Sequence, residues 1–537
     1  MKKTTSNSIK RNLITALSLM MTATMLASCG SGYDGSESRK SGSYNNERTT
    51  AENYRYSNVT AGDTDGTANI GGGYNTEEYN HLTENGYKLV SDEPLSTFST
   101  DVDTASYTNV RRMINDCWEV DPDAVRTEEF INYFKYDYEK PAEGAVSINT
   151  ELSDCPWNSE AKLMLGLQAR EAKVKDVPTN LVFLIDVSGS MEDEDKLPLV
   201  QQAFSMLAEN LGADDRVSIV TYAGSDSVVL EGESGDNSEE IVFALNSLSA
   251  GGSTAGAAGI TTAYKLAEEY FIEGGNNRVI LATDGDLNVG LSSEEELTDL
   301  ISQKRDSGVY LSVLGFGSGN YKDNRLEALA DNGNGNYAYI DSVDEAKRVL
   351  VTEMSGTLFT VAKDAKVQIE FNPENVSAYR LVGYENRLLN DEDFEDDTKD
   401  AGDIGSGQQV TVLYEIVPNN GNEKSLKYQD NESKAETNEL SGEMLTVSVR
   451  YKDPEASESK LIDKSVMCSD YTEAVSQNFA KACSAAEFAM VLRNSDYASG
   501  LTAQGVVDYM EQNNVDNSEL FELIYMQNGT GSEASYW

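Results

Sequence analysis

The chain has 537 residues and a formal net charge of −49, with 91 acidic side chains against 42 basic ones. Its length is enough for about three domains, each with its own core. The negative charge excludes nucleic-acid backbones and anionic lipid surfaces as partners attracted by charge, and makes cations the natural counterparts.

The first residues are typical of an export signal. Four basic residues lie among the first eleven, and an apolar stretch from residue 13 to about residue 27 ends on LASCG (26–30). This pattern predicts a signal peptide over residues 1–28 rather than a membrane-spanning helix, because crossing a bilayer takes about 20 apolar residues. LASCG resembles a bacterial lipobox, which implies acylation of Cys29. We therefore expect an exported cell-envelope protein, anchored to a bacterial membrane only by lipid on Cys29.

Residues 29–90 are rich in Gly, Ser, Thr, Asn and Tyr and poor in aliphatic side chains. Such a composition buries too little apolar surface to order itself and predicts a flexible tether. Residues 91–178 follow as a small α+β flanking domain, with helical spacing at 110–118 and 127–134 and strand-like alternation at 147–157.

The middle third, residues 179–354, alternates apolar runs with helical stretches. The apolar runs lie at 180–186, 215–223, 277–284, 309–317 and 335–341. The helical stretches lie at 196–211, 239–248, 257–271, 294–306 and 343–354. This alternation predicts an α/β fold, with a mainly parallel sheet covered by helices on both faces. Ligands bind such sheets beyond the carboxyl ends of the strands, where Asp186 and Asp284 fall.

Residues 355–537 have a different pattern. Shorter strand-like runs at 365–372, 408–418 and 443–454 are joined by acidic loops. Helical stretches follow at about 472–492 and 504–510. We expect a C-terminal antiparallel β module with terminal helices.

Four cysteines remain besides Cys29: Cys117, Cys155, Cys468 and Cys483. An even number is compatible with disulfides in an oxidising envelope, and the local pairs 117 with 155 and 468 with 483 are the first to consider. Buried thiols are an equally good interpretation.

The strand end LVFLIDVSGSM (181–191) raises the question of chemistry. Asp186, Ser188 and Ser190 occupy alternate positions after an apolar run, and the glycine between the serines lets the backbone turn so that three oxygens converge. Hard cations such as Mg²⁺ take about six oxygen ligands. Two further oxygens are expected from other strand ends: Thr254 in GGSTAG (251–256) and Asp284 in ATDGD (282–286).

Together these segments resemble the metal-ion-dependent adhesion site of von Willebrand factor type A domains, which have a Rossmann-like fold. The resemblance covers residues 180–354. It implies a metal site made of Asp186, Ser188, Ser190, Thr254 and Asp284. The hydroxyls would bind the ion directly and the carboxylates largely through water, so that an open coordination position favours an Asp or Glu of a protein partner. Mg²⁺ is the expected ion, with Mn²⁺ or Ca²⁺ as alternatives.

STFSTDVDTASYTNVRRMI (96–114) and LVGYENR (381–387) extend the resemblance to envelope lipoproteins of the YfbK type. The expected function is metal-dependent binding of an acidic group on a protein partner, without catalysis and without nucleic acid. A metal-dependent hydrolase and a structural lipoprotein with a vestigial metal site remain as alternatives. Ser/His/Asp and Cys/His catalysis are excluded because the only histidine is His81, in the tether.

Overall fold

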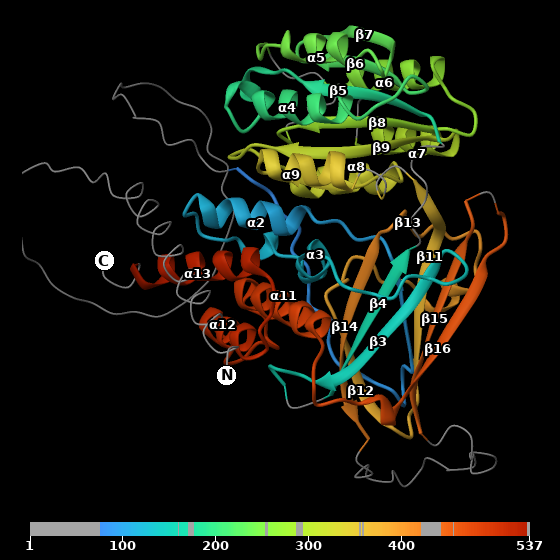
Figure 1. The fold of residues 1–537 in the computed structure, drawn as a ribbon, viewed down its shortest axis with the longest axis vertical. Helices are drawn as coiled ribbons and strands as arrows, with labels where there is room; N and C mark the ends of the chain where they lie inside the picture. The colour runs from blue at the N-terminus through green and yellow to red at the C-terminus, as the bar shows by residue number, and fades with distance from the viewer. Residues whose placement is uncertain are drawn as a thin grey trace, which may run out of the picture. The chain divides into compact units, whose positions relative to one another are not determined.

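The computed structural model describes residues 76–158, 161–169, 177–252, 256–285, 294–353, 356, 359–419, 442–454 and 456–533. These residues belong to one compact unit, Gly72–Trp537. An α/β domain, a pair of β-sheets and a cluster of helices can be followed within it in Figure 1. In the part of the chain that is described, no helix combines the length and the apolar character that crossing a membrane requires.

The α/β domain is built on a six-stranded sheet in the order β10-β9-β8-β5-β6-β7. Its strands are β5 (Thr179–Asp186), β6 (Arg216–Tyr222), β7 (Asp226–Ser234), β8 (Asn276–Thr283), β9 (Val309–Phe316) and β10 (Tyr337–Ile340). Neighbours are parallel except β6 and β7. The chain passes from β5 to β6 on one side and later reaches β8 on the other, so the strand order reverses between β5 and β8. Such a reversal opens a crevice for ligands at the carboxyl ends of the strands.

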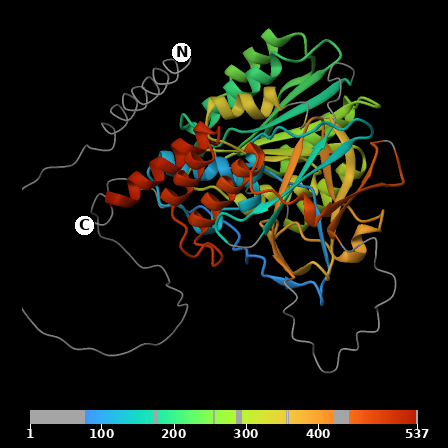
Figure 2. The same cartoon turned by 60° about the horizontal axis from the view of Figure 1, so that its bottom comes forward.

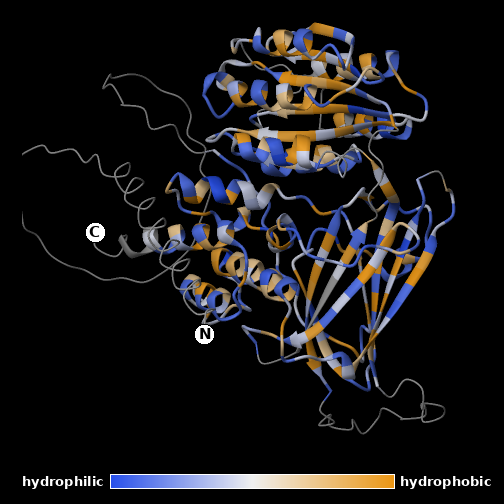
Figure 3. Ribbon diagram, viewed as in Figure 1, coloured by the Kyte–Doolittle hydropathy of each residue, from blue (hydrophilic) through white to orange (hydrophobic). Residues whose placement is uncertain are grey.

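Alternate residues of β5 face opposite sides of this sheet, and each side has its own core. Leu181, Phe183 and Ile185 pack with α4 (Leu197–Ala208), α5 (Ser238–Asn246) and α9 (Val343–Lys347). Val182 and Leu184 pack with α6 (Gly256–Glu269), α7 (Glu294–Asp306) and α8 (Asp323–Asn332). The strands are coloured largely hydrophobic in Figure 3, whereas the covering helices carry both colours. The predicted α/β fold with helices on both faces is confirmed.

The remaining strands form two antiparallel sheets. One has the order β1-β12-β14-β4-β3, and the other joins β13-β11-β15-β16 with β2 paired to β11. Their bounds are β1 (Lys88–Leu89), β2 (Leu95–Ser99), β3 (Val146–Asp154), β4 (Ala161–Ala169), β11 (Thr360–Phe371), β12 (Val376–Val382), β13 (Gly402–Gly405), β14 (Gln409–Pro418), β15 (Glu443–Lys452) and β16 (Lys460–Met467). Strands from before and after the α/β domain pair directly, β4 with β14 and β2 with β11. The segments 91–178 and 355–537, expected as two flanking regions, thus share the same sheets.

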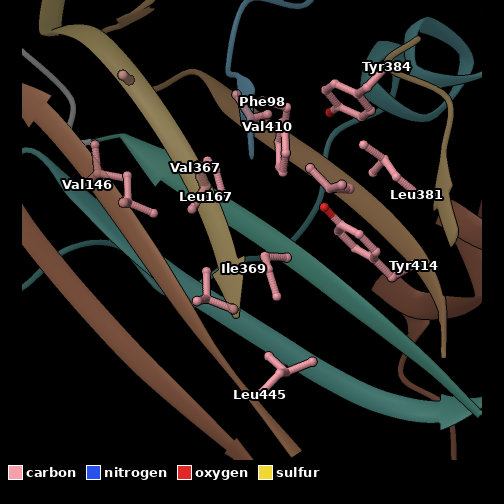
Figure 4. Close-up of a cluster of buried hydrophobic side chains, with 14 of the residues drawn as sticks. Phe98, Val146, Leu167, Val367, Ile369, Leu381, Tyr384, Val410, Tyr414 and Leu445 are labelled. Atoms are coloured by element: carbon pink, nitrogen blue, oxygen red, sulfur yellow. The ribbon is translucent and has the colours of Figure 1, made fainter. Parts of the chain in front are cut away.

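The interior between these two sheets is apolar. Phe98 of β2, Leu167 of β4, Val367 of β11 and Val410 of β14 belong to one buried core, and Figure 4 shows them close together. Burial of side chains of this size stabilises a fold by about 1.5–3 kcal/mol each. This core exists only when strands from both sides of the α/β domain have come together.

Helices from both ends of the described chain gather in a third region. They are α2 (Ala105–Asn115), α3 (Thr127–Tyr133), α11 (Gln477–Arg493), α12 (Ala503–Gln512) and α13 (Ser518–Glu533). The helices share one apolar cluster, and Figures 1 and 2 both show the red C-terminal helices beside the blue α2. Two ion pairs join these helices to the α/β domain: Arg126 lies 2.6 Å from Asp323 in a buried pair, and Arg111 lies 2.7 Å from Asp341 in a part-buried one.

Two features differ from the sequence-based prediction, and a third decides between two interpretations that the sequence left open. The helix expected at 343–354 is α9 followed by a π-helical turn, η4 (Arg348–Thr352). Residues 76–90, assigned to the tether, are part of the fold: the Thr76 N–H donates to the Gly319 carbonyl at 2.9 Å, and β1 pairs with β12. The cysteines at 117, 155, 468 and 483 all lie in described segments, and they form no disulfide with one another. Cys155 and Cys483 are buried thiols, whereas Cys117 and Cys468 are exposed.

Candidate metal centre

The carboxyl end of β5 brings three of the predicted side chains together. Asp186 ends the strand and is fully buried, and its Oδ1 accepts a hydrogen bond from the Ser188 backbone N–H at 2.8 Å. The hydroxyls of Ser188 and Ser190 lie 3.0 Å apart. One tight turn thus holds a carboxylate and two hydroxyls close to one another.

A glycine-rich loop is tied to this turn by backbone hydrogen bonds. The Gly189 N–H donates to the Gly252 carbonyl at 3.1 Å, and the Gly251 N–H donates to the Val187 carbonyl at 2.8 Å. Gly252 has φ +91°, a conformation that favours glycine. These contacts fix the start of the GGSTAG loop beside the serines. Thr254, the predicted third hydroxyl ligand, lies outside the described residues.

The second carboxylate follows β8, which runs parallel to β5. Thr283, the last residue of β8, connects the two strand ends: its Oγ1 donates to Asp186 Oδ2 at 3.3 Å and accepts the Gly285 N–H at 3.2 Å. Asp284 is 2% exposed, and its Oδ1 has no hydrogen-bond partner among the residues that the structure describes. Both predicted aspartates therefore lie at the reversal of strand order.

The electrostatics of this edge favour a cation. Burial raises the pKa of Asp186 from 3.8 to about 6; the Ser188 N–H opposes the shift, and the charge of Asp284 adds to it. A buried polar atom without a partner destabilises a fold by about 1–3 kcal/mol. A divalent cation would relieve both conditions, because it supplies positive charge next to two carboxylates and an oxygen without a donor. The four described side chains therefore fit such an ion, and two of them offer it neutral hydroxyl oxygens rather than carboxylates.

Lys196 is a further residue of the site that the sequence motif did not indicate. It precedes α4 and is 6% exposed, and its Nζ lies 3.2 Å from Asp284 Oδ2. Its stem packs against Gly317, which has φ +71° and where a Cβ would collide with the lysine. In the sequence it closes the acidic run MEDEDK (191–196), which indicates only the start of a helix.

The loop after β9 forms another wall of the site. Gly285 has φ +98°, and a Cβ there would lie 2.6 Å from the backbone nitrogen of Lys322. Only glycine allows this close approach. The N-terminal segment holds the same loop from outside: Glu77 accepts the Gly319 N–H at 2.9 Å, and Glu78 lies 2.8 Å from Lys322 Nζ.

The six-stranded sheet, with carboxylates and hydroxyls at its reversal of strand order, defines a von Willebrand factor type A domain, a class of module that is often metal-dependent and mediates protein interactions. Residues 180–351 match the family described as von Willebrand factor type A domain, residues 73–165 match von Willebrand factor, and residues 356–528 match uncharacterized protein YfbK, C-terminal. The uncharacterized protein YfbK of Escherichia coli (strain K12) is 39% identical over 472 residues, covering 84% of this chain and 81% of that one. The chain therefore belongs to the YfbK family.

More distant similarities are confined to parts of the chain or to low identity. The human inter-alpha-trypsin inhibitor heavy chain H3 is 31% identical over 210 residues, which are 37% of this chain and 23% of that one. A von Willebrand factor type A structure from Catenulispora acidiphila has 16% identity and a TM-score of 0.40, covering 71% of this chain and 89% of that one. Proximal thread matrix protein 1 from the mussel byssus, with a zinc-occupied MIDAS motif, has 23% identity and a TM-score of 0.28, covering 32% and 44%.

Proposed function

We propose that this protein is a lipid-anchored component of the bacterial cell envelope that binds a divalent cation and, through it, an acidic group of a protein partner. The proposed ligands are Asp186, Ser188, Ser190, Thr254 and Asp284. Mg²⁺ is the proposed ion, with Mn²⁺ or Ca²⁺ as alternatives. The proposal is supported above all by Asp284 Oδ1, a buried carboxylate oxygen without a donor in the described chain, beside a second buried carboxylate.

The division of roles among the side chains follows from their charges. Ser188 and Ser190 offer neutral oxygens, which bind a cation without cancelling its charge. Asp186 is fixed by two donors, the Ser188 N–H at 2.8 Å and the Thr283 hydroxyl at 3.3 Å, so its carboxylate can orient bound water. An ion held in this way keeps positive charge to offer to an anionic oxygen from outside.

The test of the metal site is the double variant Ser188→Ala, Ser190→Ala. It removes both hydroxyls and keeps the backbone turn, so the protein should fold but lose the rise in melting temperature that Mg²⁺ gives the wild type. Ser225→Ala, Ser227→Ala is the matched control, because these two serines are exposed on the same domain. An equal Mg²⁺-dependent rise in the site variant and the control would contradict the assignment.

The partner and the anchor need separate measurements. Envelope proteins captured by the full chain in Mg²⁺ should be released by EDTA and should not bind the serine double variant. Cys29, outside the described residues, is tested by Cys29→Ser, which should abolish incorporation of labelled fatty acid. Turnover of phosphate or ester substrates, abolished by Asp284→Asn, would instead indicate a hydrolase. Absence of any binding of Mg²⁺, Mn²⁺ or Ca²⁺ would indicate a vestigial site.

A further inference from the structure

Lys196 is the part of the metal centre that the proposed function does not use. Its Nζ lies 3.2 Å from one oxygen of Asp284, Oδ2, while the other oxygen, Oδ1, has no hydrogen-bond partner within the described segments. The lysine is held in place, because its stem packs against Gly317 and its backbone N–H donates to the Asp193 carbonyl at 3.1 Å. The two oxygens of Asp284 are therefore not equivalent.

We propose that Lys196 is a fixed countercharge of the metal centre, which weakens the binding of the cation and strengthens the binding of an anionic group to the loaded site. The inference rests on the proposed function. Asp186 and Asp284 together carry two negative charges when ionised, and Lys196 adds a positive one. A divalent cation then leaves the site with net positive charge, whereas without the lysine the loaded site would be neutral.

The acidic loop beside the site does not cancel this effect. Glu192, Asp193 and Glu194 follow Met191 and are exposed, and Asp195 is partly exposed, so water and salt screen the charges of this loop. Lys196 is buried, where a charge acts more strongly on its neighbours than it does at the surface. The lysine also occupies Oδ2 of Asp284, which leaves Oδ1 as the oxygen that this carboxylate can offer to an ion or to its water.

Three substitutions separate charge from hydrogen bonding. Lys196→Arg keeps both, Lys196→Gln keeps a donor but loses the charge, and Lys196→Met loses both. The binding of Mn²⁺ to the full chain, measured from the electron paramagnetic resonance signal of the free ion, should be about tenfold tighter in the Gln and Met variants than in the wild type. The Arg variant should stay close to the wild type. Lys265→Met, which removes an exposed lysine of α6, is the matched control and should change nothing.

The outcomes distinguish the inference from the proposed function. Unchanged or weaker Mn²⁺ binding in both the Gln and the Met variant would overturn the countercharge. Weaker binding in the Met variant alone would also overturn it, since the lysine would then act only as a structural support. If the wild type binds no Mn²⁺, the proposed metal site itself fails, and the inference with it.

Stability and anion binding provide two independent measurements. Removing Lys196 leaves a buried carboxylate without its cation and can destabilise the ion-free protein. The rise in melting temperature at saturating Mn²⁺ is therefore measured as well, and it should be larger in the Gln and Met variants than in the wild type. Acetate, as a carboxylate probe, should bind the Mn²⁺-loaded wild type more tightly than the loaded Gln variant, as measured by water proton relaxation. Equal acetate binding would overturn the second half of the proposal.

Discussion

Asp186→Asn is expected to stabilise the ion-free protein and to abolish its response to Mg²⁺. Asp186 is fully buried, and burial raises its pKa from 3.8 to about 6. Since one pKa unit corresponds to about 1.4 kcal/mol, the ionised carboxylate destabilises the ion-free fold by about 3 kcal/mol above pH 6. Asparagine can still accept the Ser188 N–H but loses the bond from the Thr283 hydroxyl, worth about 1 kcal/mol. A net gain of about 2 kcal/mol remains.

The pH dependence of this effect has a definite sign. Because the pKa of Asp186 is raised in the folded protein, the stability that its protonated form contributes is fully present below about pH 4 and is lost as the pH rises through about 6. Urea unfolding in EDTA should therefore show the wild type losing stability relative to the Asn variant over this window, with a constant difference at higher pH. Saturating Mg²⁺ at neutral pH should reverse the order, since only the wild type retains the carboxylate. A variant less stable than the wild type in EDTA above pH 6 would refute the reasoning.

Three further substitutions test the surroundings of the site and the buried charges. Gly285→Ala should lower the melting temperature in EDTA, because alanine is strained at φ +98° and its methyl group would lie 2.6 Å from the Lys322 nitrogen; an unchanged value would contradict the close packing. Arg126→Met removes the buried partner of three carboxylates and should decrease the free energy of unfolding in urea by about 3–5 kcal/mol. The control Lys304→Met, at a more exposed ion pair, should change this free energy by less than about 1 kcal/mol. Arg278→Met should be nearly neutral, because burial lowers the pKa of this arginine to about 10 and its Nε has no partner in the described chain; a loss as large as that of Arg126→Met would contradict this.

The sequence predicted the α/β domain best where strands are buried on both faces. β5 and β8 are buried throughout and contain the apolar runs LVFLI and VILA, because helices cover both sides of the sheet. β7 was not predicted, because DSVVLEGES is an edge strand that mixes charged and apolar residues and is nowhere fully buried. α8 was not predicted either, because DNRLEALADN is short and polar and follows a glycine-rich turn.

In the candidate site, too, the sequence predicted the residues that belong to a regular pattern and missed one that does not. Asp186 ends β5 and Asp284 directly follows the parallel strand β8, so their proximity follows from the fold that the alternating pattern predicts. Lys196 reaches Asp284 only through the packing of α4 and of Gly317, for which no local pattern exists. The sequence also does not predict which distant strands pair: β4 and β14 bring Gln168 opposite Gln409, 241 positions later in the chain.

The two antiparallel sheets are built from strands on both sides of the α/β domain in the sequence, and this has a consequence for how the protein folds. β2 and β4 precede the α/β domain in the chain, whereas β11 and β14, with which they pair, follow it. The α/β domain is continuous in sequence and can fold as soon as it has emerged, but the early strands must wait with open edges, which are templates for wrong pairing. The interval between the appearance of the early strands and that of their partners β11 and β14 is the stage at which a chaperone would matter most.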